Sequence, residues 1–190
     1  DQGAFGRVHY VKQAEKHFGP HSDWFWDPQE AGGGAFADLG CHGIAFVWWF
    51  LGRPGIKSVY AQMNTQVHGD RTEGDDETHC IIEFDNGAIG IVENSWATRG
   101  GMHDTIEVRG SPGLTSADLH RGNALPTDSE NGFAYAVEKA PSTKGWTYPV
   151  FDELYNYGFP QEMQHFARAV RGKEAPICTG EVGRVVQEVL

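Results

Sequence analysis

Polar and apolar positions alternate over residues 8–13, and a period of two is typical of a β-strand. The middle of the chain continues with further strand-forming segments. Asp85-Asn86-Gly87 is a strong turn signal, because Asn-Gly suits the tight turn of a hairpin. The sequence predicts seven strands: residues 8–13, 56–67, 78–84, 88–97, 104–110, 114–120 and 133–139.

Three other segments have the three- and four-residue spacing of apolar positions that is typical of helices. The first covers residues 35–51 and is followed by a Gly and a Pro that close it. The second runs from near Pro160 to Gly172, and the third follows Thr179 as N-cap. The third helix reaches the end of the chain without a stop signal, so we expect the natural protein to continue. The apolar stripe of the second helix consists of Met163, Phe166, Ala167 and Val170.

The order of these elements predicts an α+β fold. A strand and a helix are followed by hairpin-linked strands and then by two helices, which favours an open, mostly antiparallel sheet with helices packed on one face. The 190 residues suffice for one domain, or for one large piece of a two-domain protein.

Composition and charge exclude several classes of partner. Apolar residues make up 39% of the chain and charged residues 22%, as in globular proteins. The net charge of −11 opposes phosphate backbones and anionic membranes, so we expect neither nucleic acid nor membrane as a partner. The longest apolar run, residues 44–51, is far shorter than the roughly 18–20 residues of a membrane span. Three widely spaced cysteines form no disulfide framework, which predicts a cytoplasmic location.

The segment GGGAFADLGCHG, residues 32–43, places two ionisable groups at the start of the first helix. Asp38 and His42 are four residues apart, a spacing that puts side chains on one face of a helix. A carboxylate beside an imidazole can fix its tautomer and stabilise it after it accepts a proton, so the pair is a candidate acid–base group. The alternative is structural: an Asp near a helix N-terminus, bonded to a partly buried His. The preceding glycines permit close approach by a ligand or by another domain.

Residues 17–34 are rich in Gly, Pro, Asp and aromatic residues and are predicted to form a long loop. Loops of this length in compact domains tend to be functional. His21, Trp24 and Trp26 can form a polar and aromatic wall of a small-molecule pocket. An aromatic-rich structural loop explains the same residues equally well.

A zinc site in this loop is a weaker hypothesis. His17, His21 and Asp23 are suitable ligand types, but Gly19-Pro20 separates the histidines, so no helix aligns them. No CxxC or HExxH motif accompanies them, and we predict no metal site.

The remaining charged groups give ambiguous signals. His165 lies off the apolar stripe of the second helix and is either exposed or turned toward a cleft. There is no nucleophile elbow, P-loop or dinucleotide-binding glycine motif. One acidic run is expected to be a solvated loop between two strands: Glu73, Asp75, Asp76 and Glu77.

Several of these segments together resemble one family. GGGAFADLGCHGIAFVWWFLG resembles the GG-x₃-D-x-G-x-H helix of the Gfo/Idh/MocA family, which includes glucose–fructose oxidoreductase and inositol dehydrogenase. GRVHYV is similar to the first strand after that family's nucleotide domain, and FDNGAIGIVENSWA resembles its central hairpin. The C-terminal segment, with its TGE-x-GR sequence, is similar to the family's closing helices. The resemblance covers essentially all of the chain, although Ala45 stands where the family often has an Asp.

The resemblance implies that residues 1–190 form a C-terminal domain of the dihydrodipicolinate-reductase-like type. The family's N-terminal Rossmann domain, which binds NAD or NADP and supplies a lysine, is absent from this chain. The resemblance further implies that His42 is the base that removes a hydroxyl proton, alone or with that lysine, and that Asp38 orients His42 or holds a substrate hydroxyl. The predicted site is therefore catalytic Asp38 and His42, substrate-binding His21, Trp24, Trp26 and His165, and cofactor-binding Gly33 and Gly34.

The function predicted on this basis is that of a substrate-binding and oligomerisation domain. Its parent would be an NAD(P)-dependent oxidoreductase acting on a sugar, inositol or related polyol, and the domain alone would be inactive. In this family the open face of the sheet commonly pairs subunits, which implies a homo-oligomer. Two alternatives remain: a non-catalytic binding, regulatory or assembly module of the same fold, and a zinc-dependent hydrolase using the loop histidines.

Overall fold

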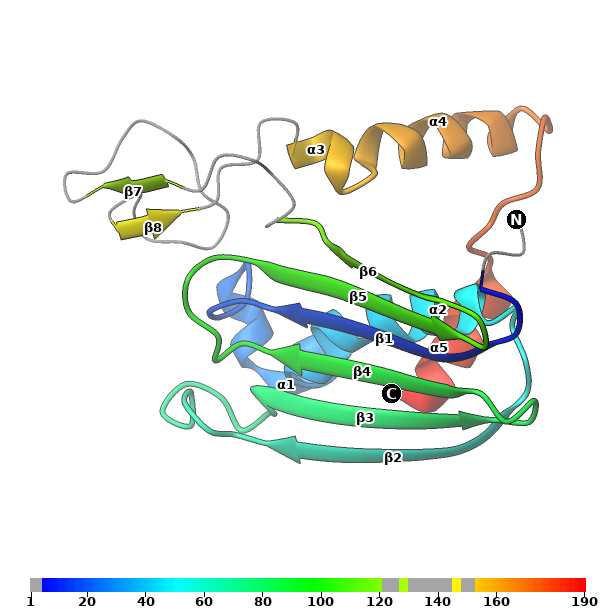
Figure 1. Cartoon of the computed structure of the whole chain (residues 1–190). Coiled ribbons are helices and arrows are strands. Elements are labelled where there is room, and N and C mark those ends of the chain that lie inside the picture. Colours follow the sequence, from blue (N-terminus) through cyan, green and yellow to red (C-terminus); the bar gives the residue numbers. More distant parts are fainter. Residues whose placement is uncertain (1–4, 121–126, 130–144, 148–152) are drawn as a thin grey trace.

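A six-stranded open sheet forms the framework of the protein (Figure 1). The computed structural model describes residues 5–120, 127–129, 145–147 and 153–190. The strand order is β2-β3-β4-β1-β5-β6; β1 pairs with β4 in parallel, and the other four pairs are antiparallel. The predicted mostly antiparallel sheet is therefore confirmed. The strands are β1 (Val8–Lys16), β2 (Ile56–Asn64), β3 (Glu77–Phe84), β4 (Ile89–Ser95), β5 (His103–Gly110) and β6 (Leu114–Asp118).

Six of the seven predicted strands are present with ends that differ by a few residues. The seventh, residues 133–139, lies outside the described residues. Two further strands, β7 (Thr127–Ser129) and β8 (Gly145–Thr147), pair antiparallel in a separate two-stranded sheet.

All three predicted helices are also present. The helices are η1 (Asp23–Trp26), α1 (Pro28–Ala31), η2 (Phe36–Gly40), α2 (Cys41–Phe50), α3 (Glu153–Asn156), α4 (Phe159–Val170) and α5 (Gly180–Val189). The predicted first helix corresponds to η2 and α2, and its first turns have the wider π-helical geometry. The predicted long loop, residues 17–34, is partly helical, since it contains η1 and α1. Asp27 caps α1 by accepting a hydrogen bond from the backbone N–H of Gln29. In the described part of the chain, no helix is long and apolar enough to cross a membrane.

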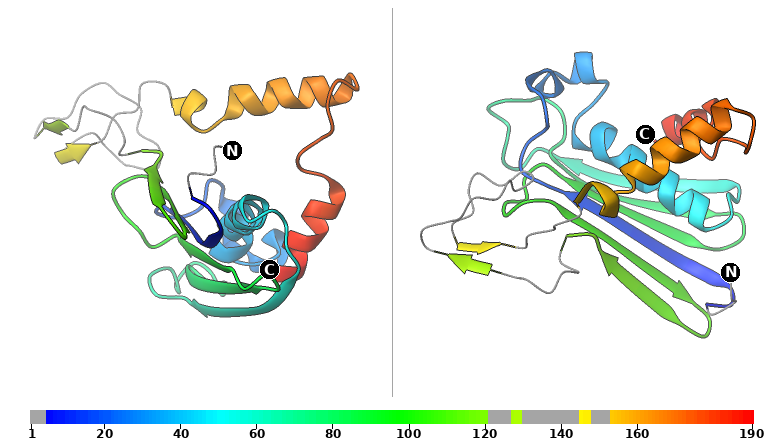
Figure 2. Two further views of the ribbon diagram at one scale, coloured as in Figure 1. Left: turned by 45° about the vertical axis from the view of Figure 1, so that its right-hand side comes forward. Right: turned by 90° about the horizontal axis from the view of Figure 1, so that it is seen from above.

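The core lies between one face of the sheet and α2, with α5 packed beside α2 (Figure 2). Glycines allow the close approach: a Cβ on Gly90 would lie 2.4 Å from Val47 Cγ1, and one on Gly43 would lie 2.6 Å from Val92 Cγ1. This close packing fixes the position of α2 over β1 and β4. The core residues are Val11, Phe36, Ile44, Val47, Cys80, Ile82, Phe84, Ala88, Val92, Val108, Val182, Val186 and Val189.

The helix α4 differs from expectation. Its apolar stripe is where the spacing predicts, but Met163, Phe166 and Val170 are all exposed, and the helix stands away from the sheet in Figure 1 and in the left view of Figure 2. In contrast to α4, the last helix, α5, adds its apolar face to the core next to α2. An amphipathic pattern identifies a helix but does not say which surface will cover it.

The acidic run before β3 is only partly the solvated loop that was predicted: Glu73 is exposed, but Asp75 and Asp76 are buried, and Glu77 begins β3. Asp76 is fully buried and accepts hydrogen bonds of 2.7 Å from the backbone N–H groups of residues 66–68. These bonds hold the pKa of Asp76 below its ordinary value, against the opposing effect of burial. Asp75 is buried beside the start of η2 and bonds to it.

The contact between Asp75 and the start of η2 generates a stability prediction for Gly34→Ala. The new Cβ would lie 2.2 Å from the backbone oxygen of Asp75, which cannot move without breaking its own bonds. We expect the free energy of unfolding to fall by about 2 kcal/mol or more in equilibrium urea unfolding. Gly183→Ala in α5 is the matched control, because its Cβ would meet nothing within 4 Å and should stabilise the helix by about 0.5–1 kcal/mol. Equal stability of the two variants would contradict the packing account.

Candidate active site

A row of polar side chains crosses one end of the covered face of the sheet. Thr78 of β3, Asn94 of β4, Glu15 of β1 and Asp104 of β5 lie opposite one another in successive ladders. Because side chains two apart in a strand share a face, this row lies on the same face as the apolar core. The face thus changes from apolar to polar toward the end where β1 leaves the sheet.

The helix η2 places Asp38 at this polar end. Its carboxylate Oδ2 accepts a hydrogen bond of 3.1 Å from the indole Nε1–H of Trp96, which is fully buried just beyond β4. The π-helical turn of η2 widens the helix at this position, and such turns occur frequently at functional sites. Asp38 is therefore held by a side chain from the segment after β4 as well as by its own helix.

Asp75 holds the start of η2 in place. Its backbone oxygen accepts from Ala35 N at 2.8 Å, and its carboxylate Oδ2 accepts from Phe36 N at 2.8 Å and from Thr78 Oγ1 at 2.6 Å. Thr78 belongs to the polar row, so the same carboxylate joins the helix start to the sheet. The negative charge also lies favourably at the N-terminal end of a helix.

His42 lies one turn farther along, on α2, and its side chain is exposed. The pKa of His42 is raised, first by a hydrogen bond with the side chain of Cys41 and further by the negative charges of Asp38 and Asp104, while desolvation acts in the opposite direction. His42 thus lies within electrostatic range of Asp38 and of a third ionisable group, Asp104 from β5. An exposed imidazole with a raised pKa is a suitable proton acceptor.

Glu15 is the most strongly perturbed carboxyl group of the site. Desolvation, followed by the charges of Asp104 and Asp38, raises the pKa of Glu15 to about 8, and a hydrogen bond with Gln13 offsets only part of this effect. Burial also raises the pKa of Asp104, although Gln13 Nε2 donates to its Oδ1 at 3.3 Å. Such perturbed groups in one cluster are typical of functional sites.

The predicted aromatic wall is only partly near Asp38. Trp26 packs edge-on against Trp96, with ring centroids 5.5 Å apart, so it lies one side chain away from the Asp38 carboxylate. Trp26 also lines an open recess of about 630 Å³. Arg71 lines the same recess, and its guanidinium stacks on the Trp26 ring. Trp24 is exposed and stacks on Phe25.

The loop histidines form a contact of their own. His17 is buried, with Nδ1 2.7 Å from the backbone oxygen of Gly19, and its ring meets that of the exposed His21 edge-on. Among the residues that the structure describes, no group of three or more His, Cys, Asp or Glu side chains is arranged to hold a metal ion. The geometry therefore gives no support to the zinc-hydrolase alternative.

His165 lies on α4 and is bonded to the segment that follows this helix. Its Nδ1 lies 2.8 Å from Glu174 Oε1, and its Nε2 accepts from Ile177 N at 3.0 Å. Because Nε2 accepts, Nδ1 carries the proton and donates it to Glu174. Both ring nitrogens thus have partners within the chain, and a contact with substrate remains a prediction.

The glycines before η2 have a structural reason of their own. A Cβ on Gly34 would collide with Asp75. A Cβ on Gly33 would lie 2.7 Å from Ala37 Cβ. The close approach that the glycines permit is therefore made by the chain itself. A contact between Gly33 or Gly34 and a cofactor remains a prediction.

Sequence reasoning missed five residues of this site: Gln13, Glu15, Asn94, Trp96 and Asp104. A signal was present in β1, where Val11, Gln13 and Glu15 share the covered face and change from apolar to acidic. Polar residues on a face that should be buried are informative. The register that brings Asp104 opposite Glu15 is not visible in the sequence.

Residues 1–115 match the family model of the GFO/IDH/MocA C-terminal domain. The chain belongs to the Gfo/Idh/MocA family. This Gfo/Idh/MocA domain is similar to the uncharacterized oxidoreductase YrbE of Bacillus subtilis, with 28% identity over 185 residues that make up 96% of the chain and 50% of the relative. Myo-inositol 2-dehydrogenase of Thermotoga maritima is 26% identical over 188 residues, 97% of the chain and 52% of the relative.

A solved structure supports the same assignment. The crystal structure of GenD2 from gentamicin A biosynthesis, in complex with NAD, superposes with a TM-score of 0.90 at 33% identity. The match covers 100% of the Gfo/Idh/MocA domain described here and 53% of the GenD2 chain. The domain thus spans about half the length of the relatives that it matches.

The pKa of Glu15 generates a prediction for the pH dependence of stability. Because the folded pKa, about 8, lies above the ordinary value of 4.5, folding favours the protonated acid. The contribution of protonated Glu15 to the free energy of unfolding is fully present below pH 4.5 and is lost as the pH rises toward 8. The variant Glu15→Gln lacks this titration, so we expect its advantage in unfolding free energy over the wild type to grow by about 1–3 kcal/mol between pH 5 and 8.

Urea unfolding at several pH values measures this difference. Glu188→Gln in α5 is the control, because Glu188 is exposed and far from the row in sequence. A Glu15→Gln variant whose stability keeps the pH slope of the wild type would show that Glu15 is ionised in the folded protein at neutral pH.

Proposed function

We propose that this chain is the substrate-binding and oligomerisation domain of an NAD(P)-dependent oxidoreductase acting on a sugar, inositol or related polyol. The observation that carries the proposal is the exposed His42 beside Asp38 and the acidic end of the sheet. Membership of the Gfo/Idh/MocA family and the similarity to a myo-inositol 2-dehydrogenase support the reaction type and the substrate class.

Oxidation of a secondary alcohol requires a group that removes the hydroxyl proton. His42 is accessible to a substrate, and its raised pKa makes it a stronger base than an ordinary imidazole. Asp38 stabilises the imidazolium that forms, and its bond from Trp96 Nε1 keeps the carboxylate in position while the proton moves. When bound, NAD(P) would take up the carbon-bound hydrogen together with its electron pair.

The residues of this chain fit the proton-transfer part of that reaction better than the binding of the nucleotide. At Gly33 and Gly34 the Cβ side of the backbone is occupied by Ala37 and Asp75, so packing within the chain already accounts for both glycines, and their contact with a cofactor stays a prediction. We propose that the cofactor is held mainly by a part of the protein outside this chain. In support, GenD2 was crystallised with NAD and is about twice as long as the matched region.

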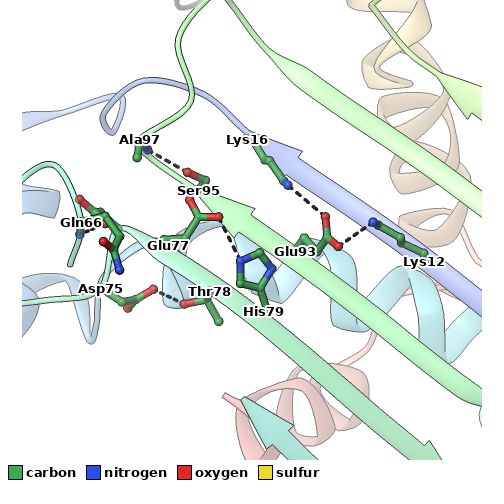
Figure 3. Close-up of polar contacts among 11 residues, drawn as sticks. Lys12, Lys16, Gln66, Asp75, Glu77, Thr78, His79, Glu93, Ser95 and Ala97 are labelled. Atoms are coloured by element: carbon green, nitrogen blue, oxygen red, sulfur yellow. Dashed lines mark hydrogen bonds and ion pairs between the residues drawn. The ribbon is translucent and has the colours of Figure 1, made fainter. Parts of the chain in front are cut away.

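The open face of the sheet is the proposed subunit interface. Tyr60 is 65% exposed, Ile81 44% and Ile89 40%, and they come from three adjacent strands. Ion pairs flank this apolar group, including Lys12 and Lys16 on Glu93 (Figure 3). An apolar centre with a charged surround is the usual composition of an interface. We propose that two copies pair through this face.

The catalytic assignment is tested in the full-length protein. His42→Ala and Asp38→Ala should each lower kcat/KM for the oxidation of a polyol substrate by roughly 10²–10⁴, the usual effect of removing an acid–base group. Initial rates of NAD(P)H formation measure this loss, and Glu188→Gln serves as the control. Values within about threefold of wild type would refute the roles of His42 and Asp38. Binding of polyols without any turnover would favour the non-catalytic module.

The interface is tested by a charge on the open face. Ile81→Asp places a carboxylate in the apolar group and should shift the protein to the monomer in sedimentation velocity, because an unpaired buried charge is costly. Ile177→Asp is the control, since Ile177 is also exposed but follows α4. An unchanged oligomer in the Ile81→Asp variant would exclude this face as the interface.

A further inference from the structure

We infer that the acidic end of the sheet selects substrates that carry a protonated amino group, with Glu15 and Asp104 as the partners of the ammonium. This inference rests on the proposed function and narrows its substrate class from polyols in general to amino sugars and aminocyclitols. It comes from the geometry of the polar row and from the partners that its members have.

The first observation is that Glu15 and Asp104 face each other directly. Their Cα atoms are partners in the antiparallel β1–β5 ladder, and both side chains lie on the covered face. Side chains in such pairs are only about 5 Å apart at Cβ, and like charges placed there destabilise a sheet. Asp38 adds a third carboxylate to the same cluster.

The second observation is that the described residues supply no Lys or Arg to this pair, and that the cationic side chain near it is the imidazole of His42, which acts on Asp104. Within the described residues, no Lys or Arg forms an ion pair with Glu15 or Asp104. The two lysines of β1, Lys12 and Lys16, point to the opposite face and bind Glu93 (Figure 3). The donor that reaches Asp104 is the neutral amide of Gln13, at 3.3 Å.

The third observation concerns Asn94, which lies opposite Glu15 in the β1–β4 ladder. Its side chain is 0% exposed, yet neither Oδ1 nor Nδ2 has a hydrogen-bond partner. Buried side-chain amides are normally bonded, so an unused amide within the row points to a group that the chain does not supply. Gln13 Oε1 is a further buried acceptor without a partner. The end of the sheet thus offers an excess of acceptors.

An ammonium group satisfies this site better than the alternatives. It carries three donors and a positive charge, so it can bond to both carboxyl groups and favour their ionised forms. A hydroxyl can donate only one bond and brings no positive charge that would favour ionisation of Glu15 beside Asp104. A metal ion would require a convergent set of ligands, and the part of the chain described by the structure contains no such group.

Binding of an ammonium should be linked to the protonation of Glu15. The groups that face Glu15 are Asp104 from β5 and Asp38 from η2, while His42 faces Asp104 from α2. With its pKa raised to about 8, Glu15 is largely protonated at pH 7 and would release its proton when a cation binds. A neutral sugar would cause no such release.

The test compares matched compounds on the full-length protein. D-glucosamine and D-glucose differ by an ammonium in place of one hydroxyl, as do scyllo-inosamine and scyllo-inositol. We expect the amine of at least one pair to be preferred by roughly tenfold or more in kcat/KM, since charge-assisted hydrogen bonds are about twice as strong as neutral ones. Glu15→Gln and Asp104→Asn should each reduce this preference by about tenfold, and Glu188→Gln should not change it.

Calorimetry separates this inference from the proposed function. Titration of each amine at pH 7 in buffers of different ionisation enthalpy should show release of up to about one proton in the wild type and none in Glu15→Gln. Absence of turnover on every compound would contradict the proposed function. The calorimetric binding measurement would still decide whether the acidic end of the sheet selects an ammonium group. Failure of both amines to bind, neutral analogues that bind equally well, or an amine preference that survives both substitutions would overturn the inference.

Discussion

The position of the candidate site depends on the contact between Asp75 and the start of η2. The carboxylate of Asp75 bonds to Phe36 N and Thr78 Oγ1, and its backbone oxygen bonds to Ala35 N, so one residue joins the helix start to the sheet. The contact is possible only because Gly34 has no side chain. It aims the widened turn of η2, and with it Asp38, at the polar end of the covered face.

The site is formed where the core ends. Apolar residues of β1, β4 and α2 pack closely through Gly43 and Gly90 at the middle of the sheet, which holds the helix rigidly. Toward the end of the same face, Glu15 and Asp104 replace the apolar residues and oppose each other, a placement that costs stability. Destabilising groups that are kept on a rigid framework are a usual property of functional sites.

The parts predicted from the sequence are those that depend on local spacing. The helix with Asp38 and His42, the hairpin at residues 85–87 and the capping at Thr179 all follow from neighbours a few residues apart. The pairing of Glu15 with Asp104 follows from strand register, which a single sequence does not reveal. The burial of Asp75 and Asp76 was missed for the same reason: an acidic run suggests solvent unless the backbone N–H groups that bind it are known.

The two faces of the sheet handle charge in opposite ways. On the open face, Lys12 and Lys16 both bind Glu93 and hold the pKa of its carboxyl group below the ordinary value, although burial acts in the other direction. On the covered face, alternate residues of the same strand leave Glu15 with no cation among the described residues, and its pKa rises to about 8. Because lysine side chains alternate with these positions along β1, a shift of register by one residue would neutralise the covered face and bury the lysines. The acidic end of the covered face is therefore a consequence of the register that also builds the core, and the raised pKa of Glu15 is the cost of that placement.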